Sequence, residues 1–541
     1  HVPAPEPLPE FRTLVLRRSV RELMETPLRK VVEEELLPVY LAMRRWASAR
    51  GHGIDHLHVT EAIPLGSQFL LCEIDARAGE HEACYFLPLG IAWDTDTLPA
   101  LPQQLALSRV RRGRLTGYLT DAFALPAFVA AFLGAMAEEA RLPAHEGEVV
   151  FRPTDAFRAI ELPPDPPIHW LSSEQSNSSL IVADKVVLKL IRQPHAGLHP
   201  EVEMTEFLTR KGARGIAPFL GEVARVDTHG TPRTLAIMEG FIGNQGDAWG
   251  WTLNYLRGTA TDLALSGEEQ VGTRAGHVAF FRIIGHRLGG MHAILAQDSD
   301  TPAFAPERAS EDDTAALAAT VHEEVGRALD VLATLHEWPH AGDGERAAAL
   351  LAGRDALLQQ VATLAAAGRG TLRTRIHGDF HLGQVLVVEN DAVIIDFEGQ
   401  PLTPLAERRR KASPLRDVAG LVRSIAYVAD TARIADSDTT GHPAAEQSAE
   451  RAMEYVSAFH DEACRTFMEG WREGMGESAA AIGTEQARSA LLRLFLMEKA
   501  AYEIRYEAAN RPAWIGTPIA GLHRFLATAA APTPAAQGER P

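Results

Sequence analysis

The sequence predicts an α+β protein of two or three lobes, with a strand-rich N-terminal part and a mainly helical C-terminal part. Short runs that favour half-buried strands occupy residues 56–60, 67–74 and 83–92. Long patterns of helical spacing follow at residues 278–295, 312–335 and 347–367. The next stretch, residues 376–401, holds two short apolar β-branched runs on either side of a turn, so we expect a β-hairpin there.

The remaining N-terminal elements alternate between linker, helix and connector. A Pro-rich linker at residues 2–9 precedes a strand-like run at residues 11–16. Apolar residues at helical spacing predict a helix over residues 28–49, and a second helical pattern covers residues 125–140. The face of the first helix is formed by Leu36, Leu37, Tyr40, Leu41 and Trp46.

Composition excludes several classes of protein. The chain has 53 Lys and Arg against 71 Asp and Glu, and a net charge of −18 opposes nucleic acid or an anionic membrane as the main partner. No apolar run has the length of a membrane span. Three cysteines, Cys72, Cys84 and Cys464, are too few and too scattered for a disulfide framework or a zinc site, so we expect a reducing, cytoplasmic location. Because the chain opens with His1, we expect a fragment of a longer protein.

The hairpin stretch carries two acids and an amide at its ends. Asp379 precedes the first strand and Asp396 follows the second, so a tight hairpin returns both acids to one end of the sheet. Gln384 follows Asp379 by five residues, the spacing in a protein-kinase catalytic loop between the catalytic Asp and a metal-binding Asn. We therefore expect Asp379 to accept the proton of an attacking hydroxyl, and Asp396 and Gln384 to hold Mg²⁺ against the phosphates of ATP.

Residues 174–190 read as loop, strand, tight turn and strand, the arrangement that covers and grips nucleotide phosphates in kinases. No Gly-rich loop is present, and Ser176, Asn177 and Ser178 are the predicted phosphate donors instead. Lys189 is the predicted gripping lysine, whereas Lys185 lies at the turn, where a solvated lysine is expected.

A helix that begins at Pro200 supplies the ion-pair partner of Lys189. We predict Glu203 for this role, with Glu201 as the competing candidate. Residues 234–242 read as a strand that leads into the linker between lobes, where kinases hold adenine. The predicted adenine contacts are Met238, Glu239 and Phe241, although an ordinary edge strand has the same pattern.

Two further segments predict the acceptor site. A basic run follows residue 404. Such runs usually form a solvated face, but the position of this one next to the metal-binding end favours contact with phosphate or sugar hydroxyls. Asp417, at the start of the next helix, suits a helix-capping role. The last long helix, residues 491–509, mixes Tyr residues with Glu, Arg and Lys, which suits a carbohydrate better than a plain core. The predicted substrate residues are His381, Glu398, Arg408, Lys411, Arg416, Tyr502, Glu503, Tyr506 and Asn510.

These blocks, residues 174–189, 377–401, 404–421 and 499–514, resemble bacterial maltokinases of the aminoglycoside-phosphotransferase-like branch of the protein-kinase-like fold. The resemblance implies a bilobal kinase-like fold with an N-terminal cap subdomain, and ATP- and Mg²⁺-dependent phosphorylation of maltose at its anomeric hydroxyl. The product, maltose 1-phosphate, would feed α-glucan or glycogen synthesis from trehalose. Residues 9–16 are similar to the tail of a trehalose synthase joined to a maltokinase, so we expect a fused or associated trehalose synthase as partner.

The resemblance also divides the chain. We expect a linker or fusion remnant at 1–20, the cap at 21–122, an intermediate subdomain with the nucleotide-binding sheet at 123–243, a helical C-lobe at 244–526 and a disordered tail at 527–541. Two blocks depart from the family pattern. Where the family tends to have Arg-Trp-Phe and then Lys, this chain has Arg45-Trp46-Ala47 and then Arg50, which concerns cap packing. Gln400 replaces a common acid, which loosens the substrate assignment.

Two alternatives stay open. A kinase of the same fold could act on glucosamine or an aminoglycoside, with Glu503 and Glu507 receiving the amine. A catalytically weak scaffold for a trehalose synthase is the other reading, and intact Lys189, Asp379 and Asp396 argue against it.

Overall fold

The computed structural model describes residues 12–47, 53–95, 100–171, 177–266, 273–400, 403–434 and 443–529. The chain forms two compact units, and the boundary between them follows Gly243. The N-terminal unit consists of residues 1–206 and 217–243. The C-terminal unit consists of the segment Phe207–Ile216 and the residues from Asn244 onward. Residues 1–11 of the predicted linker at 1–20 lie outside the described residues, and its remainder contains strand β1. Residues 530–541 of the predicted tail at 527–541 likewise lie outside the described residues, whereas helix α17 continues to Ala529. The finer division into subdomains stays a prediction.

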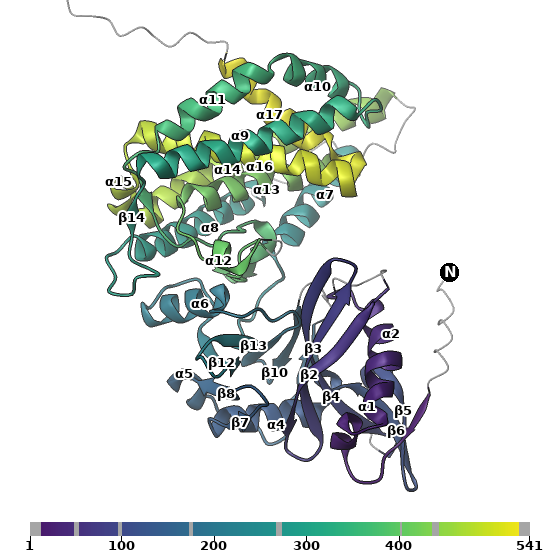
Figure 1. Ribbon diagram of the computed structural model, residues 1–541. Helices are drawn as coiled ribbons and strands as arrows, with labels where there is room; N and C mark the ends of the chain where they lie inside the picture. Colours follow the sequence, from purple (N-terminus) through teal and green to yellow (C-terminus); the bar gives the residue numbers. More distant parts are fainter. Residues whose placement is uncertain are drawn as a thin grey trace, which may run out of the picture. The chain divides into compact units, whose positions relative to one another are not determined.

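The N-terminal unit begins with a six-stranded sheet in the order β1-β5-β6-β4-β3-β2 (Figure 1). Burial alternates along β2, as expected for a strand with one face in the core. The helical segment that ends with α2 (Leu37–Ala42) packs Tyr40 and Leu41 against the sheet, and Trp46 is buried just beyond the helix. The strands are β1 Thr13–Val15, β2 His56–Leu65, β3 Phe69–Ala78, β4 His81–Trp93, β5 Ala106–Arg112 and β6 Leu115–Asp121.

A second sheet of seven strands has the order β7-β8-β12-β13-β11-β10-β9. Helix α4 (Pro126–Ala137) is almost wholly apolar, and its Phe128, Phe132 and Met136 form one core with inward residues of this sheet such as Phe151 and Met238. The strands are β7 Arg141–Pro143, β8 Glu148–Pro153, β9 Ile168–Trp170, β10 Asn177–Val182, β11 Val186–Ile191, β12 Phe219–Val226 and β13 Pro232–Gly240.

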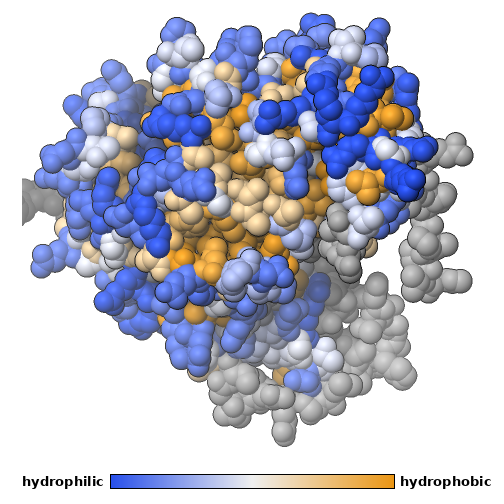
Figure 2. Space-filling model, turned by 90° about the horizontal axis from the view of Figure 1, so that it is seen from below, coloured by the Kyte–Doolittle hydropathy of each residue, from blue (hydrophilic) through white to orange (hydrophobic). Residues whose placement is uncertain are grey.

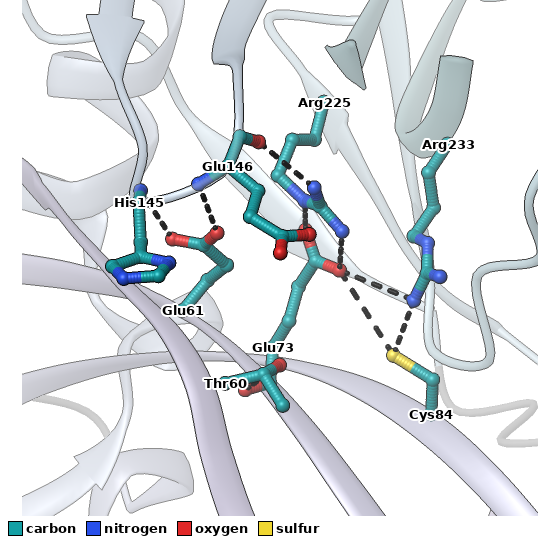
Figure 3. A network of polar contacts seen from close by, with 8 residues as sticks. All are labelled: Thr60, Glu61, Glu73, Cys84, His145, Glu146, Arg225 and Arg233. Carbon is teal, nitrogen blue, oxygen red and sulfur yellow. Dashed lines mark hydrogen bonds and ion pairs between the residues drawn. The ribbon is translucent and has the colours of Figure 1, made fainter. Parts of the chain in front are cut away.

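A buried ionic cluster joins the two sheets of this unit (Figure 3). Glu73 on β3 is 1% exposed and receives hydrogen bonds from Arg225 on β12 and Arg233 on β13, the latter at 3.3 Å. Arg233 also lies 2.9 Å from the thiol of Cys84 on β4. Because these arginines belong to one sheet and Glu73 to the other, the cluster fixes how the sheets meet within the unit.

The C-terminal unit is mainly helical, with two small two-stranded sheets. Its helices are α7 Ala248–Ser266, α8 Thr273–Leu295, α9 Glu311–Thr334, α10 Asp343–Ala352, α11 Arg354–Ala366, α12 Leu405–Arg408, α13 Leu415–Ile434, α14 Pro443–Met475, α15 Ser478–Ile482, α16 Glu485–Asn510 and α17 Gly516–Ala529. Its strands are β14 Glu307–Arg308, β15 Leu372–Arg373, β16 Val385–Val388 and β17 Asp391–Ile394. Within the described ranges, no helix combines the length and apolar character that crossing a membrane requires.

The predicted helix at residues 347–367 is two helices, because α10 ends and α11 begins at Gly353. A Cβ at Gly353 would lie 2.3 Å from a methyl carbon of Leu526, so the break accommodates the last helix of the chain.

The surface is not uniformly polar: one face of the molecule carries a central apolar area bordered by hydrophilic residues (Figure 2).

Candidate active site

The hairpin predicted within residues 174–190 is present as β10 (Asn177–Val182) and β11 (Val186–Ile191), and it presents Lys189. Strands β10 and β11 are joined by a tight turn in which Ala183 and Asp184 both have φ of 51°, the two positive values of a type I′ turn, and the N–H of Lys185 donates to the Val182 carbonyl at 3.0 Å. Lys189 Nζ lies 3.0 and 2.8 Å from the two carboxylate oxygens of Glu201, which is 1% exposed. Lys185 instead donates to the carbonyl oxygen of Glu161 at 2.6 Å and is exposed.

The ion-pair partner of Lys189 is therefore Glu201, and our prediction of Glu203 is wrong. Helix α6 (Pro200–Arg210) starts where expected, but its rotation decides which acid faces β11. A side chain two residues further along a helix is turned by about 200°, so Glu203 leaves the side of the helix that Glu201 occupies. Glu201 was the competing candidate.

The polar residues before Lys189 do not act as one group. Ser176 lies outside the described residues, and Asn177 is half-buried at the start of β10. The Ser178 side chain is buried and accepts a hydrogen bond from Arg192 Nε at 2.8 Å, so its predicted contact with phosphate stays a prediction. Arg192 is held in turn by Asp121 at 2.6 Å, which makes Ser178 part of the packing inside this unit.

The predicted adenine contacts lie at the end of β13. The Met238 side chain is fully buried in the core, and Glu239 is half-buried. The backbone N–H of Phe241 donates to the Lys185 carbonyl at 2.8 Å, and that of Gly240 donates to the Pro218 carbonyl at 2.9 Å. These two donors are used inside the unit, so adenine binding here stays a prediction that rests on the other backbone groups.

In the C-terminal unit, the predicted catalytic hairpin is formed by β16 and β17. Leu382–Gln384 form a short 3₁₀ turn before β16, and the side chain of Gln384 donates its Nε2–H to Asp396 Oδ2 at 2.8 Å. Asp396 has φ of 66°, a left-handed conformation in which Asp and Asn are enriched among residues other than Gly. The two predicted metal ligands are thus brought into direct contact.

The buried ring of His377 joins the two ends of this hairpin stretch. Its Nε2 lies 2.9 Å from the carbonyl oxygen of Ile395, which precedes Asp396, and its Nδ1 accepts the backbone N–H of Asp379 at 3.3 Å. A neutral imidazole with the proton on Nε2 satisfies both contacts. His377 therefore sets the spacing between the backbones of the predicted base and the predicted metal ligand, a role that sequence reasoning missed.

Asp417 holds the same loop from the side of α13. Its carboxylate accepts the backbone N–H groups of His377 at 2.8 Å and Gly378 at 2.9 Å. Burial raises the pKa of Asp417, but hydrogen bonds from His292 and these amides outweigh burial and keep the pKa below its ordinary value. We predicted that Asp417 caps its own helix, but its carboxylate instead accepts hydrogen bonds from backbone N–H groups of the catalytic loop.

His381 lies within the loop. Its Nδ1 accepts the backbone N–H of Gly383 at 3.1 Å, and burial lowers its pKa despite the nearby carboxylate of Asp379. The ring is therefore neutral at neutral pH, with Nδ1 occupied. Its contact with substrate stays a prediction that only its other nitrogen can fulfil.

A cavity of about 160 Å³ lies beside Asp379 in this unit. Glu324, Arg416, Glu498, Lys499 and Tyr502 contribute to its wall. Lys499 Nζ lies 3.9 Å from Asp379 Oδ1, and burial, with the charge of Asp379, raises the pKa of the Tyr502 hydroxyl. A second cavity of about 530 Å³ shares Gly378, Gln400 and Arg416 with the first and is lined by the predicted residues Arg408 and Lys411.

The basic residues at these cavities are anchored by the protein itself. Arg416 donates to both oxygens of Glu498 at 2.7 Å, and Lys411 pairs with Glu307. Arg408 Nε donates to the Thr403 carbonyl at 2.7 Å, and burial lowers the pKa of its guanidinium. Glu398 is 8% exposed. Their predicted contacts with substrate are not tested by this geometry.

The predicted residues of α16 divide into exposed and buried groups. Tyr502 and Tyr506 are 37% and 43% exposed, and their rings stack with centroids 6.3 Å apart. Glu503 is buried and accepts hydrogen bonds from both Nε and Nη2 of Arg423, so its carboxylate is used inside the unit, and its role toward substrate stays a prediction. The side-chain amide of Asn510, the last residue of α16, donates a hydrogen bond to the Tyr506 carbonyl at 2.9 Å.

A strand-borne Lys–Glu pair and a loop–hairpin that presents Asp379, Gln384 and Asp396 define the class of this protein as a kinase-like phosphotransferase. Residues 168–437 match the family model described as the phosphotransferase enzyme family (APH). The predicted α+β kinase-like fold class is confirmed.

Curated relatives include two glucosamine kinases. That of Mycolicibacterium smegmatis is 28% identical over 360 residues, which cover 66% of this chain and 79% of the relative. That of Streptacidiphilus jiangxiensis is 26% identical over 361 residues, 65% of this chain and 72% of the relative.

Among solved structures, a glucosamine kinase in complex with glucosamine, ADP and inorganic phosphate matches with a TM-score of 0.59 at 19% identity, over 90% of this chain and 99% of the other. A second crystal form matches with a TM-score of 0.60 over 91% and 99%. At this identity the likeness shows the fold.

Proposed function

We propose that this chain transfers the γ-phosphoryl group of ATP to the anomeric hydroxyl of maltose, with Mg²⁺ as cofactor. The observation that carries the choice of a neutral sugar is the state of the carboxylates around Asp379. Among the described residues that line the adjoining cavity, Glu324 pairs with Arg505 and Glu498 with Arg416, while Asp417 is buried and accepts hydrogen bonds from His292 and two backbone N–H groups. An ammonium group would find the first two carboxylates already neutralised and the third already hydrogen-bonded, whereas a polyhydroxyl acceptor needs paired donors and acceptors.

The size of the site supports an acceptor larger than one hexose. The cavity beside Asp379 shares the lining residues Gly378, Gln400 and Arg416 with the second, larger cavity of about 530 Å³, and the stacked rings of Tyr502 and Tyr506 offer an apolar face for sugar C–H groups. The maltokinase-like residue blocks from Glu174 to Trp514 supply the specific assignment of maltose. A trehalose synthase remains the proposed partner for supplying maltose from trehalose.

In this mechanism the proton of the sugar hydroxyl passes to the carboxylate of Asp379 as the hydroxyl oxygen forms its bond to the γ-phosphorus. The bond between the γ-phosphorus and the oxygen bridging to the β-phosphate breaks, and ADP leaves with that oxygen. Lys189, held by Glu201, binds the phosphates.

The metal fits the donors present. Asp396 supplies a carboxylate, and rotation of the Gln384 amide turns its oxygen to where Nε2 now lies, so the two residues together offer the oxygen ligands that Mg²⁺ prefers. When bound, the metal neutralises charge on the transferring phosphoryl group.

Glucosamine is the second candidate acceptor, because both curated relatives named above are glucosamine kinases. The sequence-based suggestion that Glu503 and Glu507 receive its amine is not supported, since Glu503 pairs with Arg423, and Glu507 pairs with Arg511 at 2.6 Å. A glucosamine kinase would need another carboxylate.

The test is ADP release with Mg·ATP and maltose, glucosamine or kanamycin in parallel, with NMR of the product. We expect turnover with maltose and loss of its free reducing end. Turnover with glucosamine alone would replace the proposal by the second candidate, and no turnover with any acceptor would favour the scaffold reading.

A further inference from the structure

Helices α8 and α14 approach each other with backbone against backbone. A Cβ on Gly285 would lie 2.2 Å from the Phe467 carbonyl oxygen, and one on Gly470 would lie 2.1 Å from that of Arg282. Gly289 and Gly474 repeat this contact one turn further on, at 2.3 Å from the Trp471 carbonyl and 2.2 Å from the His286 carbonyl. No larger residue fits at these four positions without moving a helix, and the close approach brings Trp471 to His292.

Trp471 and His292 form a hydrogen bond in which only Trp471 can be the donor. The Trp471 indole N–H, on a side chain 1% exposed, donates to His292 Nδ1 at 3.1 Å. His292 has no exposed surface, and its Nε2 lies 3.0 Å from Asp417 Oδ2. Because an indole can only donate, Nδ1 must accept, which leaves the ring proton of neutral His292 on Nε2, directed at Asp417.

Asp417 connects this pair to the catalytic loop. The same Oδ2 that receives His292 accepts the backbone N–H of His377 at 2.8 Å, while Oδ1 accepts that of Gly378 at 2.9 Å. His377 in turn contacts the N–H of Asp379 and the carbonyl before Asp396. An unbroken series of hydrogen bonds therefore runs from α14 to the backbones of the predicted base and metal ligand.

We propose that Trp471 and His292 are positioning residues for phosphoryl transfer: they fix the orientation of the Asp417 carboxylate and, through it, the loop that carries Asp379. The inference rests on the proposed phosphoryl transfer but not on the identity of the acceptor. Neither residue contacts the cavity beside Asp379, and their effect is exerted through the geometry of the loop.

Trp471→Phe tests the pair, because it keeps an aromatic ring but removes the indole N–H together with the rest of the five-membered ring. The matched control is Trp251→Phe on α7, a half-buried indole that stacks on His277, away from the series. We expect Trp471→Phe to lower kcat about fivefold to tenfold, with KM for sugar and the stoichiometry of Mg·ATP binding unchanged, and the control to match wild type. A merely structural role would reduce kcat only in proportion to the fraction of protein that binds nucleotide.

Hydrogen exchange of the peptide that contains residues 376–384 gives a readout that needs no acceptor. Trp471→Phe should speed exchange in this peptide, and Trp251→Phe should not. If wild type turns over no acceptor, the proposed function fails while exchange still tests the series. Equal exchange and equal kcat for Trp471→Phe and its control would overturn the inference.

His292 provides the rescue test. His292→Leu removes the donor to Asp417 and should lower kcat about 100-fold, as loss of a supporting hydrogen bond does at comparable sites. His292→Gln keeps one donor and one acceptor, and we expect it to recover most of that loss. Equal kcat for the Leu and Gln variants would show that His292 only fills space.

Discussion

Gln384 donates its side-chain N–H to Asp396 across 2.8 Å, so the two predicted metal ligands are hydrogen-bonded partners. The contact shows that the one-methylene difference between Gln and the Asn usual in kinases does not prevent the side chain from reaching its partner. It also gives Gln384 two states: a donor to Asp396, or, after the amide turns, a second oxygen ligand beside it.

Gln384→Ala should raise the Mg²⁺ concentration for half-maximal activity about tenfold, because one of two protein ligands is lost. The variant keeps the hairpin, whose strands pair from Val385 onward. Activity titrated against Mg²⁺ at fixed ATP measures the shift, and an unchanged midpoint would remove Gln384 from the metal site.

Asp379→Asn should lower kcat by roughly 10²- to 10⁴-fold, because the amide cannot accept the proton of the sugar hydroxyl. The Asp379 side chain is partly exposed, and its one ion pair with a described residue is that with Lys499 at 3.9 Å, so the fold should be preserved. Steady-state kinetics with a thermal unfolding control measures this, and turnover at the wild-type rate would exclude Asp379 as the base.

The two acids at the start of α6 provide a matched pair. Glu201→Gln should lower kcat/KM for ATP about 10- to 100-fold, because Lys189 loses a charged, buried partner. Glu203→Gln, two residues away and half-buried, should stay within about twofold of wild type. If the Glu203 variant shows the larger loss, the pairing with Glu201 is not the one used in catalysis.

Glu73→Leu should lower the free energy of unfolding of the N-terminal unit by about 3 kcal/mol, because Arg225 and Arg233 lose their buried carboxylate. Glu80→Leu, exposed at the turn after β3, should change it by less than about 0.5 kcal/mol. Urea denaturation of both variants measures these free energies of unfolding. Equal stabilities would mean that the cluster does not hold the two sheets together.

The three cysteines should react slowly with iodoacetamide at pH 8. Burial raises the pKa of Cys72, Cys84 and Cys464 to about 12, and the charge of Glu73 adds to the effect at Cys84 while Arg233 opposes it. The thiolate fraction at pH 8 is then about three orders of magnitude below that of a free cysteine. Mass spectrometry of native and urea-unfolded protein measures the ratio, and fast labelling of Cys84 in native protein would contradict it.

Sequence reasoning located what is encoded locally. The hairpin around Asn390, the tight turn before Lys189 and the alternation that presents Lys189 each depend on neighbouring residues, and each is present. The spacing from Asp379 to Gln384 likewise placed the latter beside Asp396.

The side-chain contacts that the sequence did not reveal depend on partners far away in the chain. Ser178 turns inward because Arg192 is held by Asp121, which is 71 residues from it. Glu503 is buried by Arg423, 80 residues away, and the choice of Glu201 over Glu203 depends on how α6 packs. The supporting residue His292 precedes Asp417 by 125 residues, so no local pattern joins them.

The left-handed backbone at Asp396, with φ of 66°, restricts this position twice over. The conformation disfavours side chains other than those of Gly, Asn and Asp, and the proposed chemistry needs a negative charge. Asn and Gly keep the backbone but lose the charge, whereas Glu keeps the charge on a side chain less suited to this φ. In a saturation library, conformation and electrostatics would therefore exclude different replacements, and Asp is the one residue that both leave.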